Sequence, residues 1–361
     1  MPAPLRESTG RARFLVPNPD ALPTTPRDLT AALRAGAALE HGEVLKVEIT
    51  EHTRTTISNL SFLEVEYSAG SAPALPTRLL LKWPLATPAP LEAAEIHFYR
   101  TLAPALPSPP IVRCLATAEP SSDYRWLVLQ DLRSTHTHPP WPVRPADTEV
   151  RGAVAVLARL HARWWDSPAL GSDVGTMHTE AGLRAMVHGI SAHLPAFIED
   201  LGDDLPRADR TELEIVFSSP LRPWLRLVER RALSIIHGDA HTWNFLFPRS
   251  GKGTPYLIDW QTWHLDVGAR DLAYLIALHW DSNTRRRLEL PLLTFYHEQL
   301  QEAGVSNYSF DDLWLDYRQC VVRNLTFPII YWSRAFPRDR WRGRLDCALA
   351  AYRELSGADL R

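Results

Sequence analysis

One stretch of this sequence constrains its structure more than any other: IIHGDAHTWNFLF (235–247), followed by PYLIDW (255–260). Asp239 follows an apolar, strand-like run and a glycine, which predicts that it lies on a tight loop. Asn244 lies five residues further along, and Asp259 ends a second apolar run fifteen residues after that. A loop carboxylate, an amide oxygen and a strand-end carboxylate are hard oxygen donors of the kind that Mg²⁺ prefers. The spacing therefore predicts a site for magnesium and phosphate groups.

Phosphoryl transfer needs groups of this kind. A carboxylate orients the acceptor hydroxyl and takes its proton, Mg²⁺ bridges the phosphates, and a cation neutralises the α- and β-phosphates. A candidate for that cation is Lys82, near the end of the apolar run RLLLKW (78–83). Only three of the 39 basic residues are lysines, so a compact point charge at this position is informative.

The order of the expected elements divides the chain into a β-rich front and a helical back. The front has a helix at 27–39, a second helix that opens at Pro88 and Pro90 and runs to about 102, and strands at 43–50, 61–68, 78–83, 111–119 and 124–130. Helices then dominate, at 147–166, 179–201, 208–231, 267–281, 284–303, 311–334 and 339–355, with short β-like pieces at 244–248 and 254–260. The sequence thus predicts an α+β fold with a boundary near residues 131–133.

Three motifs in this order, H-G-D-x-x-x-x-N, I-D-W and G-x-x-x-D-L-A, resemble the aminoglycoside phosphotransferase and choline kinase group, and most of all its ecdysteroid-kinase-like members. The resemblance implies a two-lobed protein-kinase-like fold, with a small β-rich nucleotide-binding lobe over 1–132 and a larger helical catalytic and substrate-binding lobe over 133–361. It implies that Asp239 is the catalytic base and that Asn244 and Asp259 bind Mg²⁺.

The resemblance extends to the front half and covers roughly residues 43–280. LLLKW and EIHFYRTL resemble the strand and helix of the group that hold the α/β-phosphates, which implies an ion pair of Lys82 with Glu95. WLVLQDL resembles the linker between the lobes, where backbone groups at Gln130 and Leu132 would bind adenine. Further roles are implied for Asp271, which would brace the catalytic loop near His237, and for His241, which would touch the γ-phosphate.

One stretch departs from the protein-kinase pattern. The segment TEHTRTTISNLSF (50–62), which stands where a protein kinase has its glycine-rich loop, contains no glycine. Hydroxyl groups from Thr55, Thr56 and Ser58 would then take the place of the glycine-rich backbone around the phosphates.

Other interpretations of these residues remain open from the sequence. His237, Asp239 and His241 spell H-x-D-x-H, a pattern that suits a Zn²⁺-dependent hydrolase, although no further ligand cluster accompanies it. A non-catalytic nucleotide-binding protein of the same fold is a second alternative. Glu92 is a rival of Glu95 one turn earlier, and Asp271 could simply be a first-turn acid that the helix dipole favours.

The composition excludes several classes of partner. A formal net charge of −3 on 361 residues gives no reason to expect nucleic acid or an anionic membrane. No run approaches 18 apolar residues, the N-terminus lacks the apolar core of a signal peptide, and three cysteines favour a reducing cytoplasm over a disulfide framework.

We therefore expect an ATP- and Mg²⁺-dependent enzyme that transfers the γ-phosphate to a hydroxyl group of a small molecule. Neither the acceptor nor an oligomeric state follows from the sequence. The many aromatic residues favour a less charged, partly apolar alcohol such as a sterol-like or polyketide molecule.

Overall fold

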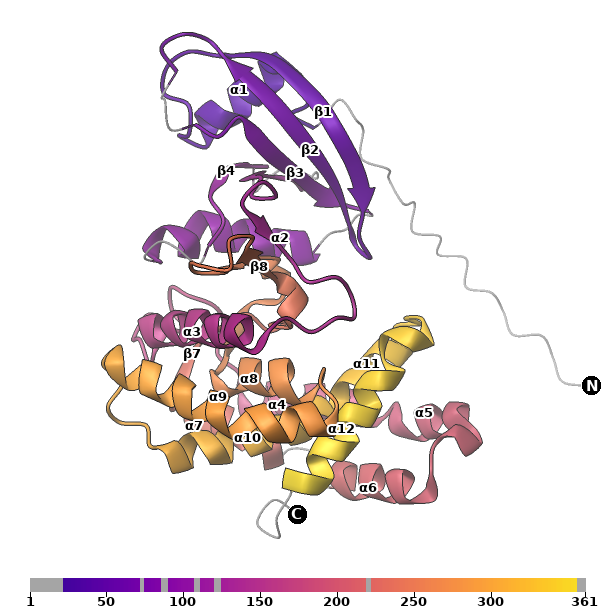
Figure 1. The fold of residues 1–361 in the computed structure, drawn as a ribbon. Helices are drawn as coiled ribbons and strands as arrows, with labels where there is room; N and C mark the ends of the chain where they lie inside the picture. Colours follow the sequence, from indigo (N-terminus) through magenta and orange to yellow (C-terminus); the bar gives the residue numbers. More distant parts are fainter. Residues whose placement is uncertain are drawn as a thin grey trace, which may run out of the picture. The chain divides into compact units, whose positions relative to one another are not determined.

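The computed structural model describes residues 22–71, 75–85, 90–106, 111–119, 125–218 and 222–355. The chain forms two compact units (Figure 1). The N-terminal unit consists of the described residues through Ala103 together with Val112–Ser134, and the helical unit consists of Pro104–Ile111 and Thr135 onward. An antiparallel sheet comes first and helices follow, which confirms the predicted α+β class.

The N-terminal unit is built on a five-stranded antiparallel sheet in the order β1-β2-β3-β5-β4. Its strands are β1 (Val44–Arg54), β2 (Ser58–Tyr67), β3 (Arg78–Pro84), β4 (Cys114–Thr117) and β5 (Leu127–Gln130). Helix α1 (Pro26–Ala35) begins at the N-cap Thr25 and buries Leu29 and Leu33 in the same core as Leu63, Leu79 and Val128. The apolar side chains predicted from the alternation in β2 and from the apolar run in β3 thus pack against α1.

The second helix of this unit differs from its prediction at the C-terminal end. Helix α2 (Pro90–His97) changes into one π-helical turn at Phe98–Leu102, which buries Phe98, Tyr99 and Leu102. In a continuous α-helix these three side chains would point in other directions. The wider π-helical turn places them in the core. Pro88, expected to open this helix, lies outside the described residues.

The helical unit contains ten α-helices among its described residues, and three of the expected helices are divided in two. The helices are α3 (Asp147–Trp164), α4 (Glu180–Ser191), α5 (Leu194–Leu201), α6 (Arg207–Ser218), α7 (Leu225–Glu229), α8 (Ala269–Ala277), α9 (Ser282–Glu302), α10 (Phe310–Asn324), α11 (Thr326–Ser333) and α12 (Arg342–Leu355). Proline explains two of the divisions, because Pro195 and Pro328 cannot donate the hydrogen bond that a continuous helix needs. Part of the third division, 219–221, lies outside the described residues.

Two small sheets frame the loop that carries Asp239. Strand β7 (Leu233–Ile236) pairs antiparallel with β10 (His264–Val267), while β8 (Phe245–Pro248) pairs with β9 (Tyr256–Leu257) and with β6 (His136–Thr137). The sequence predicted β8 and β9 but not β6 or β10. The loop therefore leaves one sheet and enters the other, and both of its ends are fixed.

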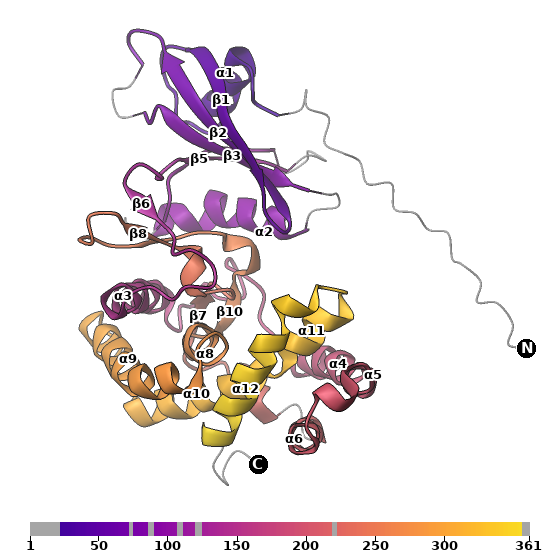
Figure 2. The same ribbon diagram turned by 45° about the vertical axis from the view of Figure 1, so that its right-hand side comes forward.

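Helix α8 is the centre of the helical unit. All nine of its residues are buried, because α9, α10 and α12 pack around it (Figure 2). The polar residues of a helix that is covered on every side must be paired inside the protein. No helix in the described ranges is long and apolar enough to span a membrane.

Candidate active site

The loop between β7 and β8 has a backbone shape that requires glycine. Gly238 has φ +81°, and a Cβ atom there would lie 2.4 Å from the carbonyl oxygen of Thr262. The turn is closed by the N–H of His241, which donates to the carbonyl of Asp239 at 2.8 Å. The side chain of Asp239 is therefore presented from a backbone that has little freedom to move.

Asp271, on the buried helix α8, anchors this loop. Its carboxylate accepts hydrogen bonds from the backbone N–H of His237 at 2.8 Å and of Gly238 at 2.9 Å, and it lies 3.3 Å from Nε2 of His161. Burial alone would raise the pKa of Asp271, but His161 and the loop N–H groups lower it, so the group stays ionised. These bonds confirm the predicted bracing of the loop near His237.

Both oxygens of the Asp239 carboxylate are held by hydrogen bonds. Tyr274, also on α8, donates its hydroxyl to Oδ1 in a short bond, and Nδ2 of Asn244 donates to Oδ2 at 3.1 Å. Burial, and next the charge of Asp239, raise the pKa of Tyr274 well above its usual value, so the phenol remains a donor. The orientation of the carboxylate is thus fixed on two sides, and its side chain remains about a quarter exposed (27%).

Asn244 and Asp259 lie at the same end of the β8–β9 hairpin. Phe245 pairs with Leu257, and beyond that pair the N–H of Ile258 donates to the carbonyl of Asn244 at 2.9 Å. Asp259 follows directly in a left-handed conformation, with φ 68° and ψ 60°. That conformation costs a non-glycine residue about 1 kcal/mol and is found often at functional sites. The oxygen donors of this pair fit the preference of Mg²⁺.

Both ring nitrogens of His237 are used in hydrogen bonds, so the ring is not placed to bind a metal ion together with Asp239 and His241. Its Nε2 is hydrogen-bonded to the carbonyl of Ile258 at 2.9 Å, and its Nδ1 accepts from the N–H of Asp239 at 3.3 Å. Within the described ranges, no group of three or more His, Cys, Asp or Glu side chains is arranged to hold a metal ion. His237 therefore has a structural role in this turn, and the hydrolase interpretation is left without the first of its three expected metal ligands.

His241 lies beside Asp239, with its Nε2 3.6 Å from Oδ2. Burial lowers the pKa of His241 more than the charge of Asp239 raises it, so the ring is neutral near pH 7. The ring packs among Trp243, Tyr274 and His279. Contact with the γ-phosphate, as the sequence suggested, stays a prediction for this residue.

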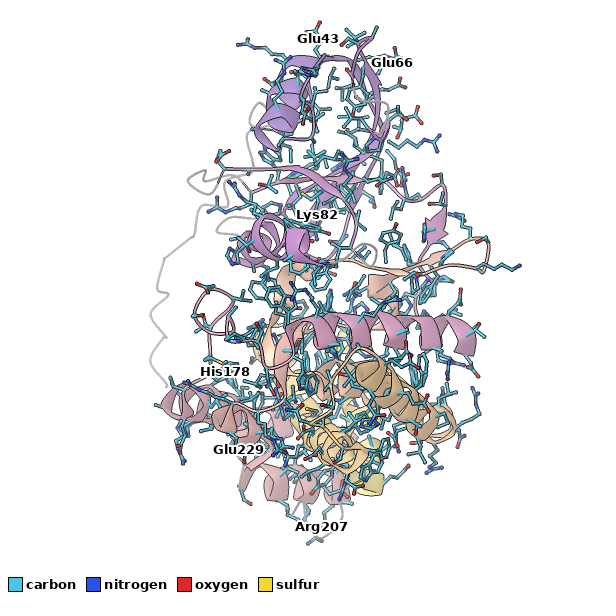
Figure 3. All side chains as sticks on the ribbon, turned by 90° about the vertical axis from the view of Figure 1, so that its left-hand side faces the viewer. Glu43, Glu66, Lys82, His178, Arg207 and Glu229 are labelled. Atoms are coloured by element: carbon cyan, nitrogen blue, oxygen red, sulfur yellow. The ribbon has the colours of Figure 1, made fainter. Side chains whose placement is uncertain are left out.

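In the N-terminal unit the structure brings Lys82 and Glu95 together. Lys82 lies on β3, with β2 and β5 on either side, and its Nζ is 2.7 Å from the carboxylate of Glu95 on α2 (Figure 3). Both side chains are buried, with exposures of 9% and 1%. Loss of one member would leave a buried charge, at a cost of about 3–5 kcal/mol. The side chain of the rival, Glu92, lies outside the described residues.

The other residues of this unit that were predicted to bind the nucleotide differ in burial and in hydrogen bonding. Gln130 ends β5 and uses its N–H to bond the carbonyl of Arg113 at 2.9 Å, so an adenine contact there would need its carbonyl instead. Leu132 is buried just beyond it. Thr55 closes the β1–β2 hairpin by accepting the N–H of Ser58 at 3.0 Å, and the Ser58 side chain is buried. Thr56 is exposed.

Several residues that complete the site were not found from the sequence. Tyr274 lies three positions after Asp271, so both face the loop from one side of α8, and that helical spacing was the available signal. His161 and His279 carried no role in the prediction although they lie in or near recognised stretches, and Arg344 comes from a helix far from the motif.

Comparisons with known proteins find a family model and solved structures that resemble this chain. The model of the phosphotransferase enzyme family (APH) matches residues 64–308. Among solved structures, a protein from Ralstonia eutropha JMP134 provisionally assigned as an aminoglycoside phosphotransferase is similar, with a TM-score of 0.55 and 13% identity over 91% of this chain and 97% of that chain. An ethanolamine kinase of Plasmodium vivax has a TM-score of 0.52 and 11% identity over 86% and 83%.

At these identities the two structures establish the fold alone, and they confirm the predicted kinase-like class. A comparison with curated protein sequences gives no match. The particular likeness to ecdysteroid-kinase-like members stays a prediction.

Proposed function

The chain belongs to the phosphotransferase enzyme family, and on that premise we propose that it is an ATP-dependent small-molecule kinase that phosphorylates a hydroxyl group. The observation that supports this most is the Asp239 carboxylate, which Tyr274 and Asn244 orient on a loop anchored by Asp271. A base held in this way is what a phosphotransferase needs for the acceptor hydroxyl.

In the proposed reaction the acceptor oxygen attacks the γ-phosphorus. A bond forms between that oxygen and phosphorus, the bond from phosphorus to the β,γ-bridging oxygen breaks, and ADP leaves. Asp239 accepts a hydrogen bond from the acceptor hydroxyl and takes its proton late in the transfer. Most of the rate gain would come from this positioning and from stabilisation of charge.

The remaining residues would hold the nucleotide. Asn244 and Asp259 would be the ligands of Mg²⁺, which when bound neutralises phosphate charge. Nδ2 of Asn244 is occupied by Asp239, so the amide oxygen is the atom that would face the ion. In the N-terminal unit, Lys82 would contact the α/β-phosphates, with Glu95 fixing its ammonium group. Gln130 and Leu132 would contact adenine.

Calorimetry of ATP binding, with and without Mg²⁺, tests the nucleotide site. The wild type should bind with micromolar to millimolar affinity, roughly −8 to −4 kcal/mol, and more tightly with Mg²⁺. Asp259→Asn should lose the gain from Mg²⁺, because it removes a charged oxygen donor. Asp173→Asn, at an exposed carboxylate in a loop, is the matched control and should keep it.

The outcomes separate the proposal from its alternatives. No ATP binding under any condition would refute the kinase function. Binding of ATP without ADP release on any panel of hydroxylated compounds would point instead to a non-catalytic nucleotide-binding protein.

A further inference from the structure

A row of ring side chains, here called the aromatic wall, continues from the Asp239 loop across the helical unit. It consists of His241, Trp243, Tyr274, His279, Phe327 and Tyr331. Neighbouring ring centroids are 4.9 Å apart for Tyr274 and His279, 4.9 Å for Tyr274 and Phe327, and 6.2 Å for Phe327 and Tyr331. The wall therefore starts at the proposed base and runs along α11, which packs beside α12 (Figure 2).

The wall is only partly covered. Phe327 and Tyr331 on α11, together with Trp243 and His279, are half-buried, whereas Tyr274 is buried. Aromatic faces left partly open next to a base can bind an apolar body by burying its surface. The acceptor hydroxyl would then be held at Asp239 while the rest of the molecule lies on the wall.

Arg344, on α12, places a cation beside the wall, close enough to Tyr331, Tyr274 and Asp239 to interact with them electrostatically. Its guanidinium carbon lies 5.1 Å from the ring centroid of Tyr331. Its Nε and Nη1 atoms are buried and have no hydrogen-bond partner in the described part of the protein. Two other arginines of α12 are paired with carboxylates: Arg342 with Asp346, and Arg353 with Glu212. A buried guanidinium N–H without an acceptor is unfavourable, which makes Arg344 a site for an anion.

The other charges near the wall agree with this. Burial lowers the pKa of His241 and, with added repulsion from Arg344, lowers the pKa of His279 well below its usual value, so both rings are neutral at pH 7. Burial alone would lower the pKa of Arg344, but Tyr274, Tyr331 and Asp239 raise it overall. The base and Arg344 are therefore the opposite charges that a bound molecule would meet along the wall.

Three acidic pairs, Glu199–Asp200, Asp203–Asp204 and Asp311–Asp312, could serve a polycationic acceptor, and one member of each is bonded elsewhere. Asp200 accepts the indole N–H of Trp332 at 2.9 Å, and Asp204 pairs with Arg338 at 2.7 Å. Asp312 donates its N–H to the N-cap Ser309 of α10, and its carboxylate pairs with Arg231 at 2.9 Å. Aromatic rings alone would also attract a cation, but the guanidinium of Arg344 beside them repels it.

We propose that the acceptor is a partly apolar alcohol with an anionic group, with its hydroxyl at Asp239, its apolar body on the aromatic wall and its anion at Arg344. This inference rests on the proposed kinase function and adds the substrate class. It excludes the polycationic acceptors for which an acidic cleft would be needed.

Binding of three probes of the same shape tests the inference without turnover: 2-naphthoate, 2-naphthalenemethanol and 2-naphthylmethylamine, measured by calorimetry on the full chain. The wild type should bind the anion at least tenfold more tightly than the alcohol, and the amine most weakly. Arg344→Gln should remove the preference, and Arg344→Lys should restore part of it, because it keeps the charge but loses the forked donors. Arg342→Gln, on the same helix, should change nothing.

An anion that binds no more tightly than the amine, or an equal preference in Arg344→Gln, would overturn the inference. A loss of ATP affinity in Arg344→Gln would also overturn it, because the guanidinium would then act on the nucleotide. The kinase function is judged separately by Mg²⁺-dependent ATP binding of the wild type, so either proposal can fail while the other stands. A thermal unfolding curve for each variant checks that it folds.

Discussion

The hydroxyl of Tyr274 is the contact on Asp239 that the motif alone does not specify. The motif supplies Asp239 and Asn244, which are five residues apart, whereas Tyr274 comes from a helix thirty residues further on. It meets the carboxylate only because Asp271, one helical turn earlier, ties α8 to the loop. Asp271 thus positions both the backbone turn of the loop and the phenol of Tyr274.

Replacing this phenol tests how much the orientation of the base matters. Tyr274→Phe should lower kcat about tenfold with little change in KM for ATP, because a hydrogen bond to a charged group contributes about 1.5–3 kcal/mol and part of it is retained through Asn244. Tyr256→Phe is the control, since Tyr256 lies in β9 away from Asp239. An unchanged kcat in Tyr274→Phe would show that Asn244 orients the base alone.

At the scale of elements, the loop between β7 and β8 requires a glycine at position 238, and the cost of replacing it can be measured. Gly238 and Gly251 both have positive φ, +81° and +69°, but an added Cβ meets the Thr262 carbonyl at the first and open space at the second. Gly251→Ala should therefore destabilise by about 1 kcal/mol for the backbone conformation alone. Gly238→Ala should cost clearly more and should also reduce turnover, because the loop must shift.

Urea denaturation of the two variants gives both free energies of unfolding. Equal losses for Gly238→Ala and Gly251→Ala would mean that the loop relaxes freely, and the rigid presentation of Asp239 would then be wrong.

The elements that the sequence predicted well are those with a strong local pattern. The alternation in 61–68 and the apolar run at 78–83 gave β2 and β3, and the motif gave the hairpin that joins Asn244 to Asp259. Strand β10 was missed because its four residues form a strand only by pairing with β7. Three helices were predicted too long. In two of them a continuous apolar pattern hid the breaks at Pro195 and Pro328.

At the scale of the whole molecule, the proposed anion site could not be predicted at all. Arg344 lies more than a hundred residues from Asp239 in the sequence, and nothing in α12 distinguishes it from Arg342 or Arg353. The difference is in the partners: two of these arginines have carboxylates, and Arg344 has aromatic rings. Local pattern does not contain that information, because it depends on how α11 and α12 pack on α8.

Two histidines beside Asp239 make the stability of the molecule depend on pH. Removal of their rings from water lowers the pKa values of His241 and His279 below the usual one. Below about pH 6.5 the unfolded chain takes up protons there while the folded chain does not, so the free energy of unfolding falls as the pH falls. Between pH 7.5 and 5.5, urea denaturation should show a loss of up to about 1.4 kcal/mol per pH unit for each histidine.

His279→Gln should flatten this dependence, because it removes one of the two groups. Thr294→Ala, at an exposed position without a titratable group, is the control and should leave the slope at that of the wild type. A wild-type stability that does not change over this range would show that the two rings are protonated in the folded state.

The family match ends at residue 308, and α11 and α12 come after it. The proposed proton acceptor and its anchor are therefore encoded in one part of the gene, and the proposed recognition of the acceptor is encoded largely in another. Mutations in α11 and α12 would leave Asp239, Asn244 and Asp271 themselves unchanged. On the proposed function, such an arrangement lets a lineage explore new metabolites at its C-terminal end while it keeps the residues of phosphoryl transfer.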